Sequence, residues 1–268
     1  MYDFQKASMW KRFSAALFDF ILLSIIVTGT ACLISFMLNY DAKFDKYNEL
    51  HKDYHVQYGL TTEEEKDSYV FDREKLSEED KAKYDEAEKA FYGNEEAMMI
   101  SSTLLNCSFI IISFSVLAGY LLVEFMFPLI FKNGQTLGKK IFGVGVMRRD
   151  GVKISPVFLF VRTILGKYTL EAMLPIFALL MLFFGVGSII GLFVLIVIVV
   201  AQIILLIVTK ARTPLHDILA QTVTVDFATQ MIFGTLEEKH EYELMLKNMQ
   251  ENADAVAEAK NVEEQKRD

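Results

Sequence analysis

The sequence predicts an all-α membrane protein with four transmembrane helices. Three nearly continuous apolar stretches, at residues 13–38, 98–131 and 171–208, lie in a chain of 268 residues that also carries 35 acidic and 27 basic side chains. About 20 apolar residues, each rising about 1.5 Å, cross the roughly 30 Å of hydrocarbon in a bilayer. Hydrophobic residues make up 53% of the chain and charged residues 23%. The two kinds are therefore segregated into membrane blocks and water-facing blocks.

Residues 1–40 are expected to form a cytoplasmic N-terminus and the first transmembrane helix. The apolar run there is longer than the roughly 7–15 residues of a signal-peptide core, so it predicts a retained anchor. Residues 98–131 supply the second helix. The third stretch is about twice the length of one span, and the small residues of Gly185–Ser188 allow a reversal near its middle. Residues 171–208 are therefore expected to form a hairpin of helices three and four.

Charge predicts the orientation of these spans. The segment 132–170 carries eight basic residues against one acid, Asp150, and loops rich in Lys and Arg face the cytoplasm. Basic residues also precede the first span and follow the last. An even number of spans places every basic flank on the same side, with both termini in the cytoplasm.

Residues 41–97 are predicted to form an acidic, helical domain outside the cytoplasm, because acids outnumber Lys and Arg two to one. One helix is expected over about 41–57, ending before Gly59. A capping box at Ser77 predicts a second helix, with Gly93 in the left-handed position that follows it. The domain is either a solvated cap or an acidic platform for a cationic partner such as a peptide.

Two histidines of this domain, His51 and His55, share a helix face at i, i+4, with Asp53 beside them. The spacing suits a metal, but two ligands are too few for a site. We therefore predict no metal and interpret them as histidines on an exposed face.

The basic segment 132–170 is predicted to hold a small cytoplasmic β-hairpin. Asp150-Gly151 favours a two-residue turn between strands at 144–149 and 152–154, and a third strand is expected at 222–226.

Ser155-Pro156 then caps a helix over 157–168, whose Arg162 and Lys167 are expected to lie along the inner membrane interface near anionic headgroups. This helix is either a structural collar or a moving gate.

Residues 209–268 are predicted to form a cytoplasmic segment and an amphipathic C-terminal helix, opened by the capping pattern at Thr235. Apolar residues recur there at spacings of four and three and form a two-heptad seam. This seam either docks on a partner or on this protein, or it belongs to a frayed acidic tail. The seam consists of Tyr242, Leu246, Met249, Ala253 and Val256.

Three motifs in order resemble the RDD family of bacterial membrane proteins, which is named for one Arg and two Asp. They are Arg12–Asp19, the glycine-rich Gly134–Gly143, and Arg212–Asp217 followed by Thr222-Val223. The resemblance covers residues 6–40 and about 98–227, and it maps the family's motif positions onto Arg12, Asp19, Gly134, Gly138, His216 and Asp217. It implies a bacterial cell membrane, and activities linked either to cation/proton exchange or to regulation of other membrane proteins. The 41–97 domain and the C-terminal helix depart from shorter members.

A polar layer is predicted within the membrane. Counted from the inner boundary, three polar residues on separate helices lie roughly 9–10 Å deep: Asp19, Glu124 and Gln202. Two neighbouring carboxylates cannot both ionise cheaply, so they are expected to share a proton or a cation, or to be neutralised by Arg12 or Arg162. The layer either fixes helix packing or handles a proton or cation.

No hydrolytic constellation is evident, so we expect neither an enzyme nor a cofactor. Two hypotheses stand equally: cation or proton transport at the intramembrane carboxylates, or a non-catalytic regulator or immunity partner that binds a membrane enzyme, a secretion component or a cationic peptide. Because a bundle of four spans encloses little volume, either role suggests an oligomer in the lipid bilayer. No nucleic-acid partner is expected.

Overall fold

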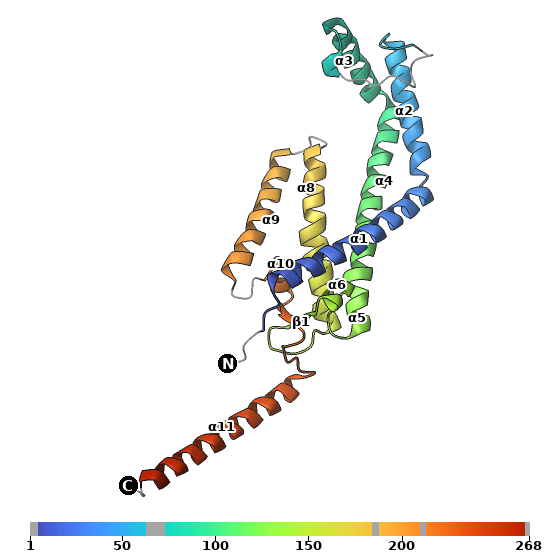
Figure 1. Ribbon diagram of the computed structural model, residues 1–268. Helices are drawn as coiled ribbons and strands as arrows, with labels where there is room; N and C mark the ends of the chain where they lie inside the picture. Colours follow the sequence, from blue (N-terminus) through green and yellow to red (C-terminus); the bar gives the residue numbers. More distant parts are fainter. Residues whose placement is uncertain (1–4, 63–72, 184–187, 210–212, 266–268) are drawn as a thin grey trace. The chain divides into compact units, whose positions relative to one another are not determined.

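The computed structural model describes residues 5–62, 73–183, 188–209 and 213–265, which are mostly helical (Figure 1). The chain forms two compact units, each described here by itself. One consists of Met1–Ser24 with Gly119–Asp268, and the other of Ile25–Ala118.

Three helices in the described residues are long and apolar enough to cross a membrane: Met9–Met37, Glu95–Phe131 and Pro156–Met181. A shorter apolar helix covers Ile189–Leu205. Most of their large apolar side chains are exposed, as lipid-facing residues are. Three apolar helices of spanning length are thus confirmed, and the fourth span stays a prediction that falls on the shorter helix. The reversal predicted around Gly185 lies outside the described residues.

These spans are built from several elements. The first is helix α1 (Met9–Met37), and the second joins α4 (Glu95–Tyr120), the π-helical η2 (Leu121–Met126) and α5 (Phe127–Phe131). The third joins α7 (Pro156–Phe160), the π-helical η3 (Val161–Met173) and α8 (Leu174–Phe183), and α9 (Ser188–Val208) follows it.

The separate interfacial helix predicted over 157–168 is not observed. The helix begins at Pro156, after Ser155 as predicted, but it continues without a break into α8. The prediction assigned Arg162 and Lys167 to the membrane interface and began the next apolar stretch at residue 171, which includes Glu171. In the structure the side chains of Lys167 and Glu171 have polar partners within the fold, so the helix need not end there.

Helices α8 and α9 pack closely against each other. At Gly191 an added Cβ would lie 2.7 Å from the carbonyl oxygen of Ala178, so the backbones approach nearer than any larger residue would allow. Small residues at such contacts are usual between membrane helices.

The second unit contains a helical pair that agrees with the sequence prediction. Helices α2 (Tyr40–Gln57) and α3 (Glu78–Gly93) pack around the fully buried Phe91. The predicted cap is present, because Ser77 Oγ accepts a hydrogen bond from the backbone N–H of Asp80 at 3.1 Å.

The prediction for the end of α3 is wrong. Gly93 is the last helical residue rather than a left-handed one after the helix. Asn94 follows in an extended conformation, and its side-chain oxygen accepts a hydrogen bond from the N–H of Ala97 at 3.0 Å. Asn94 therefore caps α4, and no left-handed turn is needed between the helices.

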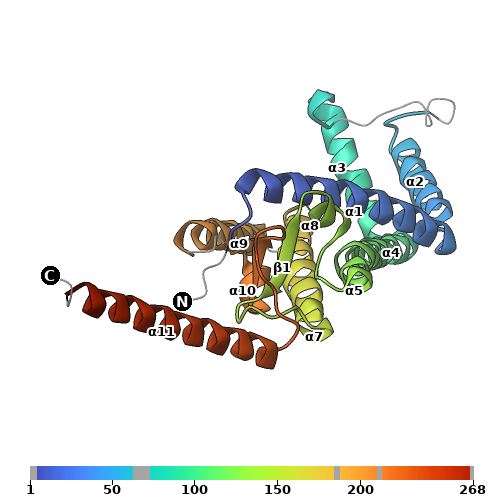
Figure 2. The same cartoon turned by 60° about the horizontal axis from the view of Figure 1, so that its bottom comes forward.

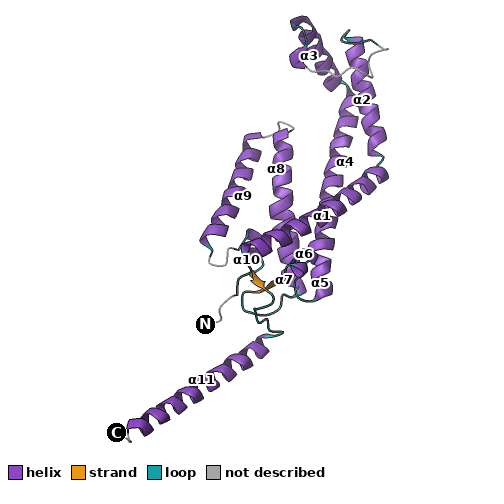
Figure 3. Ribbon diagram, viewed as in Figure 1, coloured by secondary structure: helices purple, strands orange, loops and turns teal. Residues whose placement is uncertain are grey.

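A two-stranded antiparallel sheet joins β1 (Val144–Arg148) to β2 (Thr222–Asp226), drawn in orange in Figure 3. The predicted strand at 222–226 is confirmed. Its Val223 and Val225 pack with Met147 in a small core.

The predicted β-hairpin is only partly observed. The turn forms with Gly151 at φ +90°, but the segment 152–154 gives only an isolated bridge from Lys153 to Met147. Strand β2 pairs with the full length of β1 instead. This pairing buries Val223 and Val225 of β2 against Met147.

Three more helices complete the first unit: α6 (Leu137–Ile141), α10 (Leu215–Leu219) and α11 (Leu236–Gln265). Helix α10 contacts η3, β2 and α9, and Figure 2 shows it beside β1. Helix α11 begins where predicted, since Thr235 Oγ1 accepts a hydrogen bond from the N–H of Glu238 at 3.2 Å.

Candidate functional site

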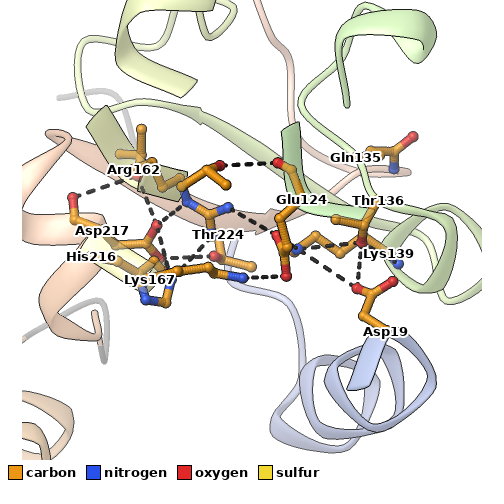
Figure 4. A network of polar contacts seen from close by, with 12 residues as sticks. Asp19, Glu124, Gln135, Thr136, Lys139, Arg162, Lys167, His216, Asp217 and Thr224 are labelled. Carbon is orange, nitrogen blue, oxygen red and sulfur yellow. Dashed lines mark hydrogen bonds and ion pairs between the residues drawn. The ribbon is translucent and has the colours of Figure 1, made fainter. Parts of the chain in front are cut away.

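Polar and charged side chains from distant parts of the chain meet inside the first unit (Figure 4). We call this set the buried polar cluster. It comprises Asp19, Glu124, Thr136, Lys139, Arg162, Lys167, Glu171, Gln202, His216 and Asp217, with Thr222 and Thr224 at its edge.

Asp19 of α1 is held by the start of α6. Its Oδ1 accepts a hydrogen bond from the backbone N–H of Gly138 at 2.8 Å, and the hydroxyl of Thr136 donates to its Oδ2. Glycine is required at 138, because a Cβ there would lie 2.4 Å from the carbonyl oxygen of Ala15. The glycine-rich segment thus lets α6 approach α1 closely enough to bind the buried carboxylate.

Lys139 places a cation between the two predicted carboxylates. Its Nζ lies 3.8 Å from Asp19 Oδ2 and 3.3 Å from Glu124 Oε2, and it also donates to Thr136 Oγ1 at 3.3 Å. Burial disfavours the ammonium form, and the attraction of Glu124 only partly offsets burial, so the pKa of Lys139 is lowered to about 8.

Glu124 lies on the π-helical η2 and faces three cations of the cluster. Besides Lys139, it accepts a hydrogen bond from Lys167, and Arg162 Nη1 lies 3.9 Å from its Oε2. The hydroxyl of Thr163 donates to the backbone oxygen of Glu124 at 3.0 Å, which joins η2 to η3.

The π-helical winding of η3 sets which of its side chains face the cluster. In an α-helix of about 3.6 residues per turn, Arg162 and Lys167 would point about 140° apart. The i→i+5 hydrogen bonds of a π-helix widen the turn, so Arg162, Lys167 and Glu171, spaced five and four apart, lie on one face. Such π-helical segments are frequent at functional sites.

Asp217 of α10 anchors the other half of the cluster. It accepts hydrogen bonds from Arg162 Nε at 2.7 Å and from the hydroxyls of Thr222 at 2.7 Å and Thr224 at 3.2 Å. Burial opposes ionisation of Asp217, but the charge of Arg162 outweighs burial and holds the pKa of the carboxyl far below its usual value. The pair fixes α10 and β2 against η3.

His216 connects this pair to Glu171. Its Nδ1 is 2.7 Å from Glu171 Oε2, and Arg162 Nη2 donates to its Nε2 at 3.2 Å. Because Nε2 accepts this hydrogen bond, Nδ1 carries the proton of the neutral ring. Burial is the main cause that lowers the pKa of His216 and favours this neutral form.

Helix η3 reaches His216 only because residue 166 is glycine, where a Cβ would lie 2.6 Å from the His216 Cβ.

A cavity of about 470 Å³ lies against the cluster. Its walls include both ends of the network, from Asp19 and Glu124 to His216 and Asp217, and also Arg12. Arg162 is 2% exposed and its Nη1 has no hydrogen-bond partner in the structure. The cavity therefore combines an apolar wall with charges of both signs.

The structure brings together most of the residues that sequence analysis proposed. Asp19 and Glu124 share Lys139, while Gln202 donates to Glu171 at 2.7 Å on the far side of the cluster. The cation predicted for Asp19 was Arg12 or Arg162. Lys139 Nζ lies 3.8 Å from Asp19 Oδ2, while Arg162 pairs with Asp217.

Sequence analysis missed Lys139, Lys167 and Glu171 as members. Lys139 and Lys167 were assigned to a loop and to the membrane interface, and Glu171 was counted with the apolar stretch. A signal for Lys167 and Glu171 was present in the sequence, because they follow Arg162 at spacings of five and four, and a spacing of five does not keep two residues on one face of an α-helix. Lys139 had no such signal.

The predicted C-terminal seam is only partly covered by other residues of this chain. Tyr242 packs on Phe233 at a ring distance of 5.4 Å, but Leu246 is 46% exposed and Met249 58%. Ala253 is exposed, and the side chain of Val256 lies outside the described residues.

The comparisons with known proteins give one match. The model of the RDD family matches residues 6–221, which include the first two motifs, the third motif through Asp217, and every residue of the buried polar cluster except Thr222 and Thr224 at its edge. No curated protein and no solved structure matches the chain.

Proposed function

Because the chain belongs to the RDD family, and carries apolar helices of membrane-spanning length, we propose that its buried polar cluster binds and exchanges a proton and a small cation across the membrane. The observation that carries this proposal is the position of Lys139, whose ammonium lies between Asp19 and Glu124 beside a cavity of about 470 Å³.

The ammonium of Lys139 occupies the place that a bound cation would take. Two carboxylates at this depth need a compensating positive charge, and a buried ion left uncompensated costs several kcal/mol. When Lys139 loses its proton, Asp19 and Glu124 lose part of that compensation. A cation such as Na⁺ or K⁺ then restores it, so proton release and cation entry are coupled.

We propose four spans, formed by α1, α4 to α5, α7 to α8, and α9, with both termini in the cytoplasm of a bacterial cell. The 21 residues of α9 are long enough for about 30 Å, and its close packing on α8 at Gly191 supports a helical hairpin. A bundle of this size encloses little volume, so we further propose that several copies assemble. The role needs no covalent step, and we propose a protein that is not an enzyme.

Ion flux tests the proposal. The full chain is reconstituted in vesicles with an internal pH dye, and an outward Na⁺ or K⁺ gradient is imposed. Asp19→Asn and Glu124→Gln are expected to abolish cation-driven pH change while the protein still elutes as a folded species. The matched control is Glu96→Gln, since Glu96 forms an ion pair with Lys46 in the other unit. Flux that persists in both cluster variants, or an equal loss in the control, contradicts the proposal.

A second candidate function is a membrane regulator or immunity partner. The exposed Leu246 and Met249 on α11 favour it, because an apolar seam on a solvent-facing helix is a common docking surface. The acidic 41–97 domain suits a cationic peptide or protein. Truncation after Gly234 is expected to remove a partner that co-purifies from crosslinked native membranes. Recovery of the same partner with the truncated chain, or no stable partner with the full chain, excludes this role for α11.

A further inference from the structure

Two histidines and one carboxylate converge between α2 and α3, in the unit that does not contain the buried polar cluster. Glu88 Oε1 lies 2.6 Å from His51 Nε2 and 3.2 Å from His55 Nε2. The three donor atoms all lie within 4.8 Å of one another. The sequence brought His51 and His55 to one helix face but gave no third ligand, because Glu88 is on the next helix.

From this convergence we propose that His51, His55 and Glu88 form a binding site for a divalent first-row transition ion of the Zn²⁺ class. The ion would join α2 to α3 through one bond to each of the three side chains. This site is independent of the proposed transport function.

The spacing of the donor atoms fits a tetrahedral ion. Zn–N and Zn–O bonds of about 2.0–2.2 Å place neighbouring donor atoms roughly 3.3–3.5 Å apart in a tetrahedron. The His55–Glu88 distance of 3.2 Å is close to this value, and the His51–Glu88 distance of 2.6 Å needs an opening of less than 1 Å. His51 and Glu88 are partly exposed, so their side chains have room for that adjustment.

The donor set selects the kind of ion. Two imidazoles and one carboxylate are the protein ligands of several three-ligand zinc sites, which keep a fourth position for water. Imidazole favours Zn²⁺, Cu²⁺ and Ni²⁺, whereas Mg²⁺ and Ca²⁺ prefer oxygen ligands alone.

The surroundings hold the ligands in place. The ring of Phe91 meets His51 edge-on at a centroid distance of 4.7 Å, and the ring of Tyr47 stacks on His51 at 6.0 Å. His55 is fully buried, contrary to the exposed position predicted for it. Tyr84 forms a hydrogen bond with Glu88, which is the kind of second contact that orients a metal-binding carboxylate.

Zinc titration of the full chain tests the site. The protein carries no histidine tag, is purified in detergent, and is stripped with a chelator before calorimetric titration with Zn²⁺. We expect one ion per chain, with a Kd in the micromolar range or tighter, and a higher Tm when Zn²⁺ is added. His51→Gln and Glu88→Gln are each expected to weaken binding at least tenfold. Both residues are partly exposed, so these variants should fold, and circular dichroism checks that they do.

His240→Gln is the matched control, because His240 is an exposed histidine on α11 and should not affect binding. Substitution of Co²⁺ adds a visible absorption band typical of tetrahedral coordination, which should disappear in the His51 and Glu88 variants. The site is refuted by binding of less than one ion per chain, by equal affinity in the Glu88→Gln protein, or by an equal loss in the His240 control.

Discussion

Lys139 shows how a single residue can link the chemistry of the cluster to pH. Its ammonium is buried with Asp19 and Glu124 on one side, and with Arg162 and Lys167 near enough to repel it. Burial and these like charges lower its pKa from the ordinary 10.5 to about 8. Glu124 and Asp19 oppose that shift without cancelling it.

This shift predicts a pH dependence of stability with a definite sign. Between about pH 8 and 10.5 the unfolded chain holds the Lys139 proton more tightly than the folded chain does. Folding stability contributed by this residue therefore rises with pH through that window and is constant below it. Denaturant unfolding of the full chain and of Lys139→Met, measured from pH 7 to 11, isolates this contribution. The free energy of unfolding of the full chain minus that of Lys139→Met should increase with pH. A difference that stays flat or falls contradicts the assigned pKa shift.

The sequence alone identified those cluster residues that lie within an otherwise apolar stretch. Asp19 and Glu124 were identified because a carboxylate within a membrane stretch is costly unless it is paired, protonated or hydrated. In the structure both carboxylates lie within 4 Å of the Lys139 ammonium. Lys139 could not be found in this way. It follows a glycine-rich segment in a basic loop, and only the close approach of Gly138 to Ala15 brings it up to α1.

The junction of α10 with η3 contains a buried ion pair between Arg162 and Asp217. Arg162 and Asp217 are 2% and 1% exposed, and the bond from Nε to Oδ1 is 2.7 Å. Breaking a buried pair leaves an uncompensated charge, so Asp217→Asn is expected to destabilise the protein by about 3–5 kcal/mol. Glu124 Oε2 lies 3.9 Å from Arg162 Nη1, so it compensates the arginine charge only slightly in this variant.

A double variant separates charge from packing at this junction. In Arg162→Met with Asp217→Asn, neither charge is left unpaired, so thermal unfolding should show recovery of a large part of the stability lost in the single Asp217→Asn protein. A double variant that is as unstable as the sum of its single variants would mean that the pair acts through shape rather than charge.

The elements themselves were predicted unevenly, and local chemistry explains the difference. Helices with a capping residue, such as α3 after Ser77 and α11 after Thr235, begin where the sequence places them. The strand at 152–154 failed because pairing is decided by burial against a distant segment, here β2. The π-helical form of η3 was not predicted, and its polar side chains contact α10 and η2, which are distant in sequence.

At the scale of the whole molecule, the number of spans determines where every water-facing part lies. Three helices satisfy the length and hydropathy of a span among the described residues, and α9 is a shorter apolar helix by the same measure. With four spans, α11 and the N-terminus share one side of the membrane and α2 and α3 lie on the other. With three, α11 would lie on the same side as α3.

Cysteine accessibility decides between these arrangements. Cys32 and Cys107 are free thiols and are first replaced by Ser. Glu79→Cys on α3 and Lys247→Cys on α11 then each supply one thiol at a side chain that is 81% or 72% exposed. A membrane-impermeant maleimide added to intact cells should label the Glu79→Cys protein at once, and the Lys247→Cys protein only after lysis. Labelling of both proteins in intact cells would favour three spans. Such a result would move α11 to the outer side and remove its proposed cytoplasmic partner.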